Sequence, residues 1–524
     1  MKIIAILFIF IQVLTTAHAE ITLDGSMGIV GKLLSEPNYQ ISAEKGKIKG
    51  NNLFHSFSKF NINTGETATF TGPERINNII SRITDNQASF IDGGLYSTIP
   101  DANLYLLNPN GIMFGPNARL NIDGSFHAST ADYLRFADDQ QFNTQTANSP
   151  ILTTAAPEAF GFLDNQHGDI NINGSILAVP VGEDLSIIGG DIQIQGQDAS
   201  NPGALFAIGG SLQIASAAST GEIMQSNIMD NTLTQLGNVS IQEEFFNTAE
   251  YPGKEVFIRA GNFFMNDVVI QTNADLGYGH IDIKADESLQ IENSRIQTST
   301  SQNKSGNIVL HGTQIELADD SQIINVNQGV EQAGGIIIEA TDSMNITDNT
   351  SVSNIASGIG SSGDIILTTS QLQINQGSKI LNNTIGAGQV GNIIIEATDS
   401  MDITDNNTSV ASVASGIGNS GDIILTTSQL QINQGSQILN ETNGIGQTGS
   451  IIIEATDSMD MIDNTSVSSI ASGNGTSGNI ILTVPKLQIN NSKITNASYI
   501  EINTEQLELV NVLVLMLKKL VAVL

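Results

Sequence analysis

The stretch "GGIIIEATDSMNITDNTSVSNIASGIGSSGDIILTTSQLQINQGS", residues 334–378, decides the fold of this 524-residue chain. It returns with few changes at residues 391–436 and at residues 449–492, so the period is 57 or 58 residues. The one spare residue falls in "DNNTS" near Asn406, which predicts that this site is a turn. A fixed period of this kind is typical of architectures in which one small unit stacks on the next.

Each long repeat divides into two units that open with Gly-x-Ile-Ile. Within a unit, β-branched runs such as "IIIEA", "SMNIT" and "TSVSNIA" are separated by turns rich in Asn, Asp, Ser and Gly, and no helical period is sustained. We therefore predict an all-β, elongated parallel β-helix, or solenoid, with three short strands in each coil. The first isoleucine of the unit recurs every 27 to 30 residues, at Ile281, Ile308, Ile336, Ile365, Ile393, Ile423, Ile451 and Ile480.

Inward-facing side chains are expected to stack in ladders along this rod. Ile336, Ile393 and Ile451 should form one ladder, and Val352, Val410 and Val467 a second ladder on another side. Seven steps of ~4.8 Å from the first to the last isoleucine give roughly 34 Å of rod. Aromatic residues make up 5% of the chain and tryptophan is absent, which favours a narrow interior over a wide globular core.

The N-terminus has the pattern of a secretory signal peptide. Lys2 is followed by an apolar run and by "AHA", so we predict a signal over residues 1–19, with Ala17 and Ala19 at the cleavage site. The formal net charge is −33, which argues against nucleic acid as a partner. The chain has no cysteine and therefore no disulfide framework.

The first half of the chain has the same strand-and-turn texture without the regular repeat. Five blocks, in order, resemble the filamentous haemagglutinin N-terminal domain, which is the secretion domain of two-partner secretion exoproteins. These blocks are "GNNLFHSFSKFNINTGETATFTG" from Gly50, "NNIISRIT" from Asn77, "IDGGLYS" from Ile91, "LLNPNGIMFGPNARLNIDGSFHAST" from Leu106 and "PEAFGFL" from Pro157.

The resemblance implies a right-handed parallel β-helix. It also implies two partners for export: the Sec machinery, and a dedicated outer-membrane β-barrel transporter whose periplasmic domains recognise this domain. The family's Asn-Pro-Asn-Gly-Ile motif matches Asn108, Pro109, Asn110, Gly111 and Ile112. A second family tetrapeptide, Asn-Pro-Asn-Leu, is absent, and the neighbouring region reads "RINNIISRIT".

The residues of this motif also have a physical reason to form a turn. Pro109 fixes φ near −65°, Asn110 and Gly111 tolerate positive φ, and the side chain of Asn108 is able to cap the turn. Tight turns flanked by apolar strands set the register of a coil locally. We therefore interpret residues 108–112 as a motif for secretion and fold initiation.

Parallel β-helices include polysaccharide lyases and hydrolases, so a catalytic role is the main alternative. Such a site needs carboxylates clustered with Arg or Lys on adjacent coils. The acidic residues here recur once per long repeat, which favours a solvated stripe; weak calcium binding by Asp and Asn turns stays open. We expect no enzyme activity, cofactor or metal site. The recurring acids are Glu339, Glu396 and Glu454, with Asp342, Asp399 and Asp457.

Two other patterns have structural explanations. Gly358, Gly360 and Gly363 match G-x-G-x-x-G, as do the triplets from Gly416 and from Gly473, but each precedes a strand and is predicted to be a turn. His55 and His127 lie inside the family blocks, and we interpret them as packing or turn residues.

We expect four segments: a signal peptide at 1–19, a secretion domain at 20–250, a repeat rod at 251–503 and an apolar tail at 504–524. The tail is either a cap on the rod or the product of a truncated reading frame. The predicted product is secreted or at the cell surface and acts as an adhesin or haemagglutinin-like protein on a host or cell-surface receptor. Two alternatives remain: an exported β-helical polysaccharide lyase or hydrolase, and a truncated contact-dependent toxin.

Overall fold

The structure is a computed structural model. It describes residues 20–510 apart from 30, 36, 146–150, 198–202, 226–231, 248–254, 275–278 and 303, and it also describes two strands at 513–516 and 520–523. The predicted signal peptide and its cleavage residues Ala17 and Ala19 lie outside the described residues.

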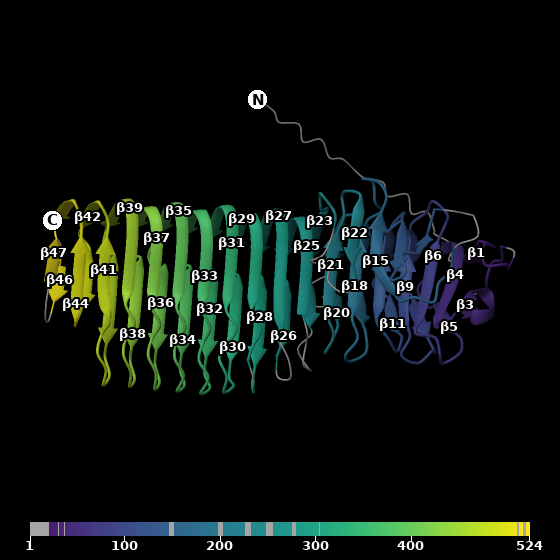
Figure 1. Ribbon diagram of the computed structural model, residues 1–524, viewed down its shortest axis with the longest axis horizontal. Coiled ribbons are helices and arrows are strands. Elements are labelled where there is room, and N and C mark those ends of the chain that lie inside the picture. Colours follow the sequence, from purple (N-terminus) through teal and green to yellow (C-terminus); the bar gives the residue numbers. More distant parts are fainter. Residues whose placement is uncertain are drawn as a thin grey trace, which may run out of the picture.

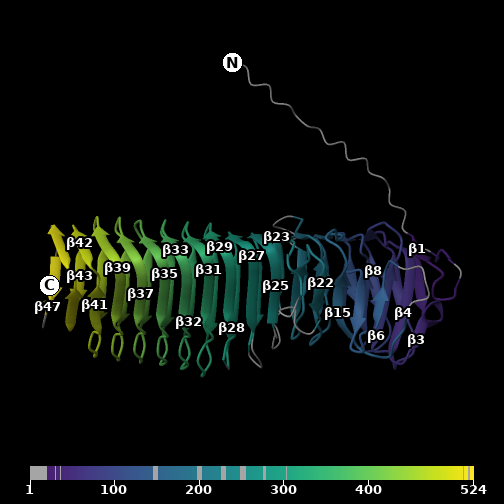
Figure 2. The same cartoon turned by 45° about the horizontal axis from the view of Figure 1, so that its top comes forward.

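The chain winds into a long stack of coils, shown in Figures 1 and 2. Each coil has three faces, and strands on the same face of successive coils pair in parallel. The parallel β-helix predicted from the repeats is confirmed. In the described residues no helix is long and apolar enough to cross a membrane.

In the first half the three faces are separate strands. The first face contains β4 (Asn52–Phe60), β6 (Asn78–Ile83), β9 (Asn103–Leu107), β12 (Phe126–Ser129), β18 (Leu185–Gly189) and β21 (Leu212–Ser216). The second contains β7 (Ser89–Ile91), β10 (Ile112–Phe114), β16 (Ile170–Asn173), β19 (Ile192–Gln195) and β23 (Asn238–Gln242). The third contains β2 (Asn38–Ser42), β5 (Thr67–Thr71), β8 (Gly94–Ser97), β11 (Arg119–Asn121), β17 (Ile176–Ala178), β20 (Gly203–Phe206) and β24 (Glu244–Asn247).

The N-terminal end of the stack is closed by antiparallel pairing. The strands β1 (Ile21–Leu23) and β3 (Lys47–Lys49) both pair antiparallel with β4, and a short 3-10 helix, η1 (Ala43–Lys45), precedes β3. These pairings give the first coil hydrogen-bond partners on the side where no further coil lies. An unpaired edge there would invite association with other chains.

In the rod, one long strand covers the first and second faces. These strands are β25 (Glu255–Asn266), β27 (His280–Glu292), β29 (Ile308–Ala318), β31 (Ile336–Ile346), β33 (Ile365–Ile374), β35 (Ile393–Ile403), β37 (Ile423–Ile432) and β39 (Ile451–Ile462). The third face contains β26 (Val269–Asn273), β28 (Arg295–Thr300), β30 (Gln322–Asn327), β32 (Ser351–Ala356), β34 (Lys379–Thr384), β36 (Ser409–Ala414), β38 (Gln437–Thr442), β40 (Ser466–Ala471), β43 (Lys493–Asn496) and β46 (Leu513–Met516).

The long strands differ from the three short strands expected per coil. In β31 the runs "IIIEA" and "SMNIT" are continuous, and the change of face is a register shift between Glu339 and Ser343. The two runs separate only near the end, as β41 (Asn479–Thr483) and β42 (Lys486–Asn490), where Pro485 intervenes. Proline has no backbone N–H to donate, so the strand ends there.

Both predicted ladders are present. The first isoleucines of all eight units pair in register from Ile281 to Ile480, and each is fully buried. On the third face Val352, Val410 and Val467 are likewise buried, with Ile380 and Ile438 on the coils between them. Because each coil buries the apolar edge of the next, stability is close to a sum of neighbouring terms.

A buried polar ladder, which the sequence did not lead us to expect, runs beside the apolar ones. Asn382 is fully buried, and its Nδ2 donates to the backbone oxygens of Gly363 (2.8 Å) and Gly391 (2.9 Å). The Ser362 hydroxyl donates to Asn382 Oδ1 at 2.6 Å and accepts the backbone N–H of Gly391 at 3.0 Å. Asn325, Asn440 and Asn496 each donate to a glycine oxygen in the same way.

The G-x-G-x-x-G triplets are turns, as predicted. Two further triplets, beginning at Gly386 and Gly444, complete a set in which glycines of successive coils stack directly on one another. A Cβ atom on Gly416 would lie 1.7 Å from the backbone oxygen of Gly386, so these positions have no room for a side chain.

The largest departure from a plain solenoid is a four-stranded antiparallel sheet outside the coils. Its strands are β14 (Gln141–Asn143), β13 (Tyr133–Phe136), β15 (Pro157–Phe162) and β22 (Gly221–Met224), in that order. They come from two insertions, at 130–169 after β12 and at 217–237 after β21, with the coil of β18 between them. We call this element the outer sheet; the repeat pattern did not predict it.

The outer sheet covers the outward side of the first face. Phe136, Phe142 and Phe160 from the sheet join Phe54 and Tyr105 from the coils in a second apolar core. The rings of Phe54 and Phe142 are 5.1 Å apart between centroids. Aromatic residues thus fill the space between the coils and this sheet, while others, such as Phe57, Phe60 and Phe126, lie inside the coils.

At the C-terminal end the winding continues. After β44 (Tyr499–Asn503), β45 (Gln506–Val510) pairs with β42, β46 pairs with β43, and β47 (Leu520–Val523) pairs with β44. The described part of the tail thus forms further strands in the parallel stack. Its role as a cap or as the product of a truncated reading frame stays a prediction.

Candidate functional site

The motif at residues 108–112 forms the corner between β9 and β10. Asn108 is fully buried, and its Oδ1 accepts the backbone N–H of Asn110 at 3.0 Å, as the expected cap of the turn. Its Nδ2 donates at 3.0 Å to Gln87 O and at 3.0 Å to Ser89 Oγ, both on the preceding coil. One side chain therefore closes the turn and also fixes it to the coil before.

The other motif residues have different roles in this corner. Gly111 has a φ of +117°, so it uses the backbone freedom that glycine provides. Asn110 is exposed and is not among the residues with positive φ, so the conformational tolerance that we expected there is not used. Its Nδ2 instead donates to Asp85 O at 2.8 Å.

The following coil is held by the backbone of the same motif. The N–H of Gly168 donates to Pro109 O at 3.0 Å, and the N–H of Ile112 donates to Asp169 O at 3.0 Å. A Cβ atom on Gly168 would lie 2.3 Å from the nitrogen of Gly111. The motif therefore fixes the point at which the chain returns from the 130–169 insertion to the coils, where β16 begins.

Ion pairs hold the strands of the outer sheet together. Arg135 on β13 donates from Nε to Glu222 on β22 at 2.8 Å and from Nη1 to Glu158 on β15. The Tyr133 hydroxyl donates to Glu222 at 2.8 Å. Burial, together with the negative charge of Glu222, raises the pKa of Tyr133 to about 12.

A buried arginine connects the outer sheet to β4 in the first coil. Arg82, within the "NNIISRIT" block, is fully buried; it donates from Nε to Ser56 Oγ at 2.8 Å and from Nη1 to the backbone oxygen of Asn143 on β14. Its guanidinium lies over the Phe142 ring, 4.7 Å from the centroid. The first two of the five sequence blocks thus meet at the 130–169 insertion.

The comparison with protein families finds a known domain in the first half of the chain. Residues 19–256 match the model of the TPS secretion domain. Residues 19–256 are a TPS secretion domain. Two-partner secretion, abbreviated TPS, exports a protein across the outer membrane through a partner transporter, so this domain implies export of the chain through such a transporter. The separation of domain and rod near residue 250 remains a prediction.

A comparison with solved structures also found similar chains. One of them is the crystal structure of the HMW1 secretion domain from Haemophilus influenzae, at 16% sequence identity and a TM-score of 0.43, covering 82% of this chain and 95% of that one. A comparison with curated proteins found no match.

Two histidines of the TPS secretion domain are fully buried in its cores. The His55 ring is stacked with the Phe57 ring, and its Nε2 lies 3.3 Å from Ser42 O. Burial lowers the pKa of His55 to about 4. His127 stacks on Tyr105 at 4.5 Å between ring centroids, with Nδ1 3.0 Å from Ser186 Oγ, and burial lowers its pKa to about 3. Both are packing residues, as the sequence suggested.

These histidines predict a loss of stability in mild acid. The unfolded chain binds a proton at each histidine below about pH 6.5, whereas the folded chain does so only near pH 4 and pH 3. The stabilisation that each neutral, buried histidine contributes is therefore fully present above about pH 6.5, and it decreases as the pH falls below that value. Between pH 7 and pH 4.5 we expect a decrease in the free energy of unfolding of about 2 to 3 kcal/mol from each histidine.

Denaturant unfolding at the two pH values measures this loss, and His127→Gln is the matched variant. The variant should lose about half as much stability between pH 7 and pH 4.5 as the native chain. Burial raises the pKa of Asp169, so this residue increases stability as the pH falls. Its effect is the same in the native chain and in the variant and cancels when the two losses are compared. An equal loss in both proteins would contradict the assignment to His127.

The rod carries the acidic residues that a catalytic site would require, but in a regular order. In the row that contains Glu339, Glu396 and Glu454, a threonine occupies every intervening coil. Glu339 is half exposed and pairs with His311 at 3.0 Å. The described residues hold no group of three or more His, Asp or Glu side chains placed to bind a metal ion.

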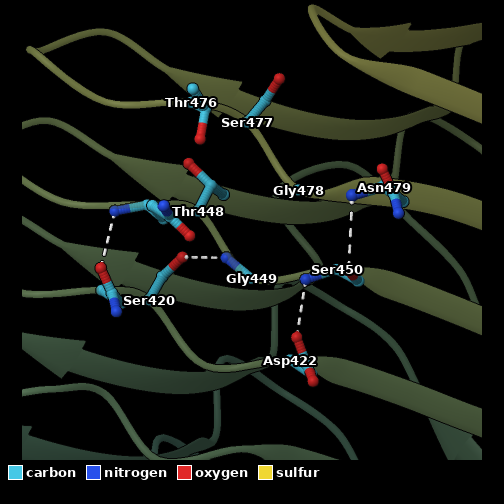
Figure 3. A pocket seen from close by; sticks show the side chains of 11 residues that line it. Ser420, Asp422, Thr448, Gly449, Ser450, Thr476, Ser477, Gly478 and Asn479 are labelled. Atoms are coloured by element: carbon cyan, nitrogen blue, oxygen red, sulfur yellow. Dashed lines mark hydrogen bonds between the residues drawn. The ribbon is translucent and has the colours of Figure 1, made fainter.

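A cavity of about 300 Å³ lies among the loops of the last coils and is shown in Figure 3. Its lining is made of hydroxyl, amide and backbone groups, with Asp422 as the one carboxylate. The N–H of Gly449 donates to Ser420 Oγ at 2.9 Å, and the N–H of Ser450 donates to Asp422 Oδ1 at 2.7 Å. These groups are used to bind one coil to the next.

Proposed function

We propose that this exoprotein is a non-enzymatic adhesin, haemagglutinin-like in its action, that presents its rod at the cell surface. The observation that carries this proposal is the arrangement of a TPS secretion domain in register with a long rod. The rod keeps its isoleucine and valine ladders inside and repeats its outward polar rows on every second coil. A regular surface of this kind offers many equal contacts to a receptor, and weak contacts then add to a firm attachment.

Removing one long repeat tests this function without disturbing the stack. Deletion of residues 391–448 joins two equivalent positions of the repeat, so the coils on either side should still pair in register. With the partner transporter present, we expect unchanged export and a weaker binding of the secreted chain to host cells or erythrocytes. Export and binding are measured on the same culture, by immunoblot and by cell attachment.

The same preparations distinguish the alternatives. Equal attachment by the deleted and full-length chains would contradict a role for the repeats. Release of reducing or unsaturated sugars from polysaccharide by the secreted chain would show an enzyme and would overturn the adhesin proposal.

A further inference from the structure

Five consecutive loops of the rod each expose one branched aliphatic side chain. The loops follow β30, β32, β34, β36 and β38 and lead into the next long strand. Soluble proteins expose single aliphatic residues routinely, so one such loop would need no explanation, whereas here the same kind of residue is exposed in five loops in a row. The exposed fractions are 63% for Val330, 66% for Ile359, 56% for Ile385, 61% for Ile417 and 58% for Ile445. We call this row the aliphatic comb.

The comb is rigidly spaced because its loops are bonded to one another. The N–H of Ile417 donates to Gly386 O at 3.1 Å, and the N–H of Ile445 donates to Gly416 O at 3.1 Å. Ile417 and Ile445 also form a parallel β-bridge. The loops project as a line along the lower edge of the rod in Figures 1 and 2. Four coil steps give this edge a length of roughly 19 Å.

Four of the five loops along this edge carry no charge, although the molecule is strongly acidic. These are the loops at 357–363, 385–391, 415–421 and 443–449, in a chain with a net charge of −33. Only the loop of Val330 has a carboxylate, on Glu331. The comb is thus a surface on which apolar groups can leave water without the desolvation of a charge.

The fold itself does not require aliphatic residues in these places. The loop "SGNGTSG" has Asn474 where the preceding coil has Ile445, and "IGAGQVG" has Ala387 where its neighbours have isoleucine. In the latter loop the aliphatic residue has moved to Ile385, so an exposed branched side chain is still present. The stacked glycines determine the conformation of the loop, and the exposed aliphatic side chains are not needed for it.

We propose that the comb inserts its aliphatic tips into the surface of a neutral, zwitterionic lipid membrane. A single row of side chains, roughly 19 Å by 10 Å, offers on the order of 200 Å², far below the ~800 Å² per partner of a stable protein interface. A second copy of the chain is therefore a poor occupant, whereas insertion into a lipid surface needs no minimum area. Anionic lipid is disfavoured because the net charge of −33 is repelled by it.

Vesicle flotation tests this proposal with the full secreted chain. The variant is Ile359→Asn/Ile417→Asn/Ile445→Asn, because the fold already accepts Asn474 at that place. The control is Ser357→Asn/Ser415→Asn/Ser472→Asn, at the exposed position that Asn443 occupies naturally. Circular dichroism and thermal melting should be the same for all three proteins.

We expect the native chain and the control to float with phosphatidylcholine vesicles and to float less when phosphatidylserine is included. The variant should bind phosphatidylcholine at least tenfold more weakly. Equal flotation of the variant, or no flotation of the native chain, would overturn the proposal. So would a dimer in sedimentation that the variant abolishes while vesicles stay unbound. Pure vesicles contain no receptor, so this outcome is independent of the adhesion test.

Discussion

Replacing Asn108 by alanine is expected to lower the free energy of unfolding by about 2 to 4 kcal/mol and to reduce the secreted yield several-fold. The change removes the acceptor of the Asn110 N–H and both donors to the preceding coil, at Gln87 and Ser89. These partners are left unpaired in a corner where Asn108 is fully buried. Denaturant unfolding of the purified chain and an immunoblot of the medium, with the partner transporter present, measure the two effects.

Asn110→Ala is the matched control within the same motif. Asn110 is exposed, and its side chain donates mainly to one backbone oxygen, that of Asp85. We expect it to change stability by less than about 1 kcal/mol and to leave folding of the corner intact. If Asn110→Ala abolished export at full stability, the exposed side chain would contact the transporter. If Asn108→Ala lost stability but was exported normally, the proposed link between this turn and secretion would be wrong.

Gly416→Ala is expected to disrupt the rod locally and to lower its free energy of unfolding by about 3 kcal/mol or more. The new methyl carbon would lie 1.7 Å from Gly386 O, and this oxygen already accepts the N–H of Ile417. The carbonyl cannot move away without loss of that bond between coils. Since each coil is stabilised by its neighbours, the damage should spread over the adjacent coils.

Hydrogen exchange and limited proteolysis measure where the rod opens. The loops near residues 386 and 416 should lose protection, while the TPS secretion domain keeps its own. Asn474→Ala, which adds no atom on an exposed loop residue, is the control and should leave both patterns unchanged. Full protection in Gly416→Ala would show that the loops have room for a side chain and would contradict the close stacking.

The repeat in the sequence was enough to predict the rod and its register. A period that repeats glycine, isoleucine and valine at fixed offsets leaves one arrangement in which the repeated strand residues stack inward as ladders. This is why the ladders of Ile336 and Val352 were predicted correctly. The turn at Asn108 was also predictable, because its chemistry is local and lies within five residues.

The joining of two strands into one and the burial of asparagines were harder to predict from the sequence. Whether "IIIEA" and "SMNIT" form one strand or two depends on a register shift between Glu339 and Ser343, which is decided by the coils on both sides. Asparagine is typical of turns, yet Asn382 is buried in a strand. Its burial is possible because Gly363, Gly391 and Ser362 provide its hydrogen-bond partners. A recurrent asparagine within the third-face strands was the available signal.

The amino-acid sequence by itself determined the winding: short β-branched runs between tight turns, repeated at one period, can satisfy their backbone hydrogen bonds only by stacking on copies of themselves. Only the tertiary structure decided the outer sheet, in which Ala159 pairs with Met224 across two separate insertions. It also decided that the motif at Asn108 holds the return of one of those insertions. The physical reason is that a periodic sequence pattern records contacts between equivalent residues of neighbouring repeats. Pairing between two unique segments, far apart in the sequence, produces no repeated pattern from which it could be predicted.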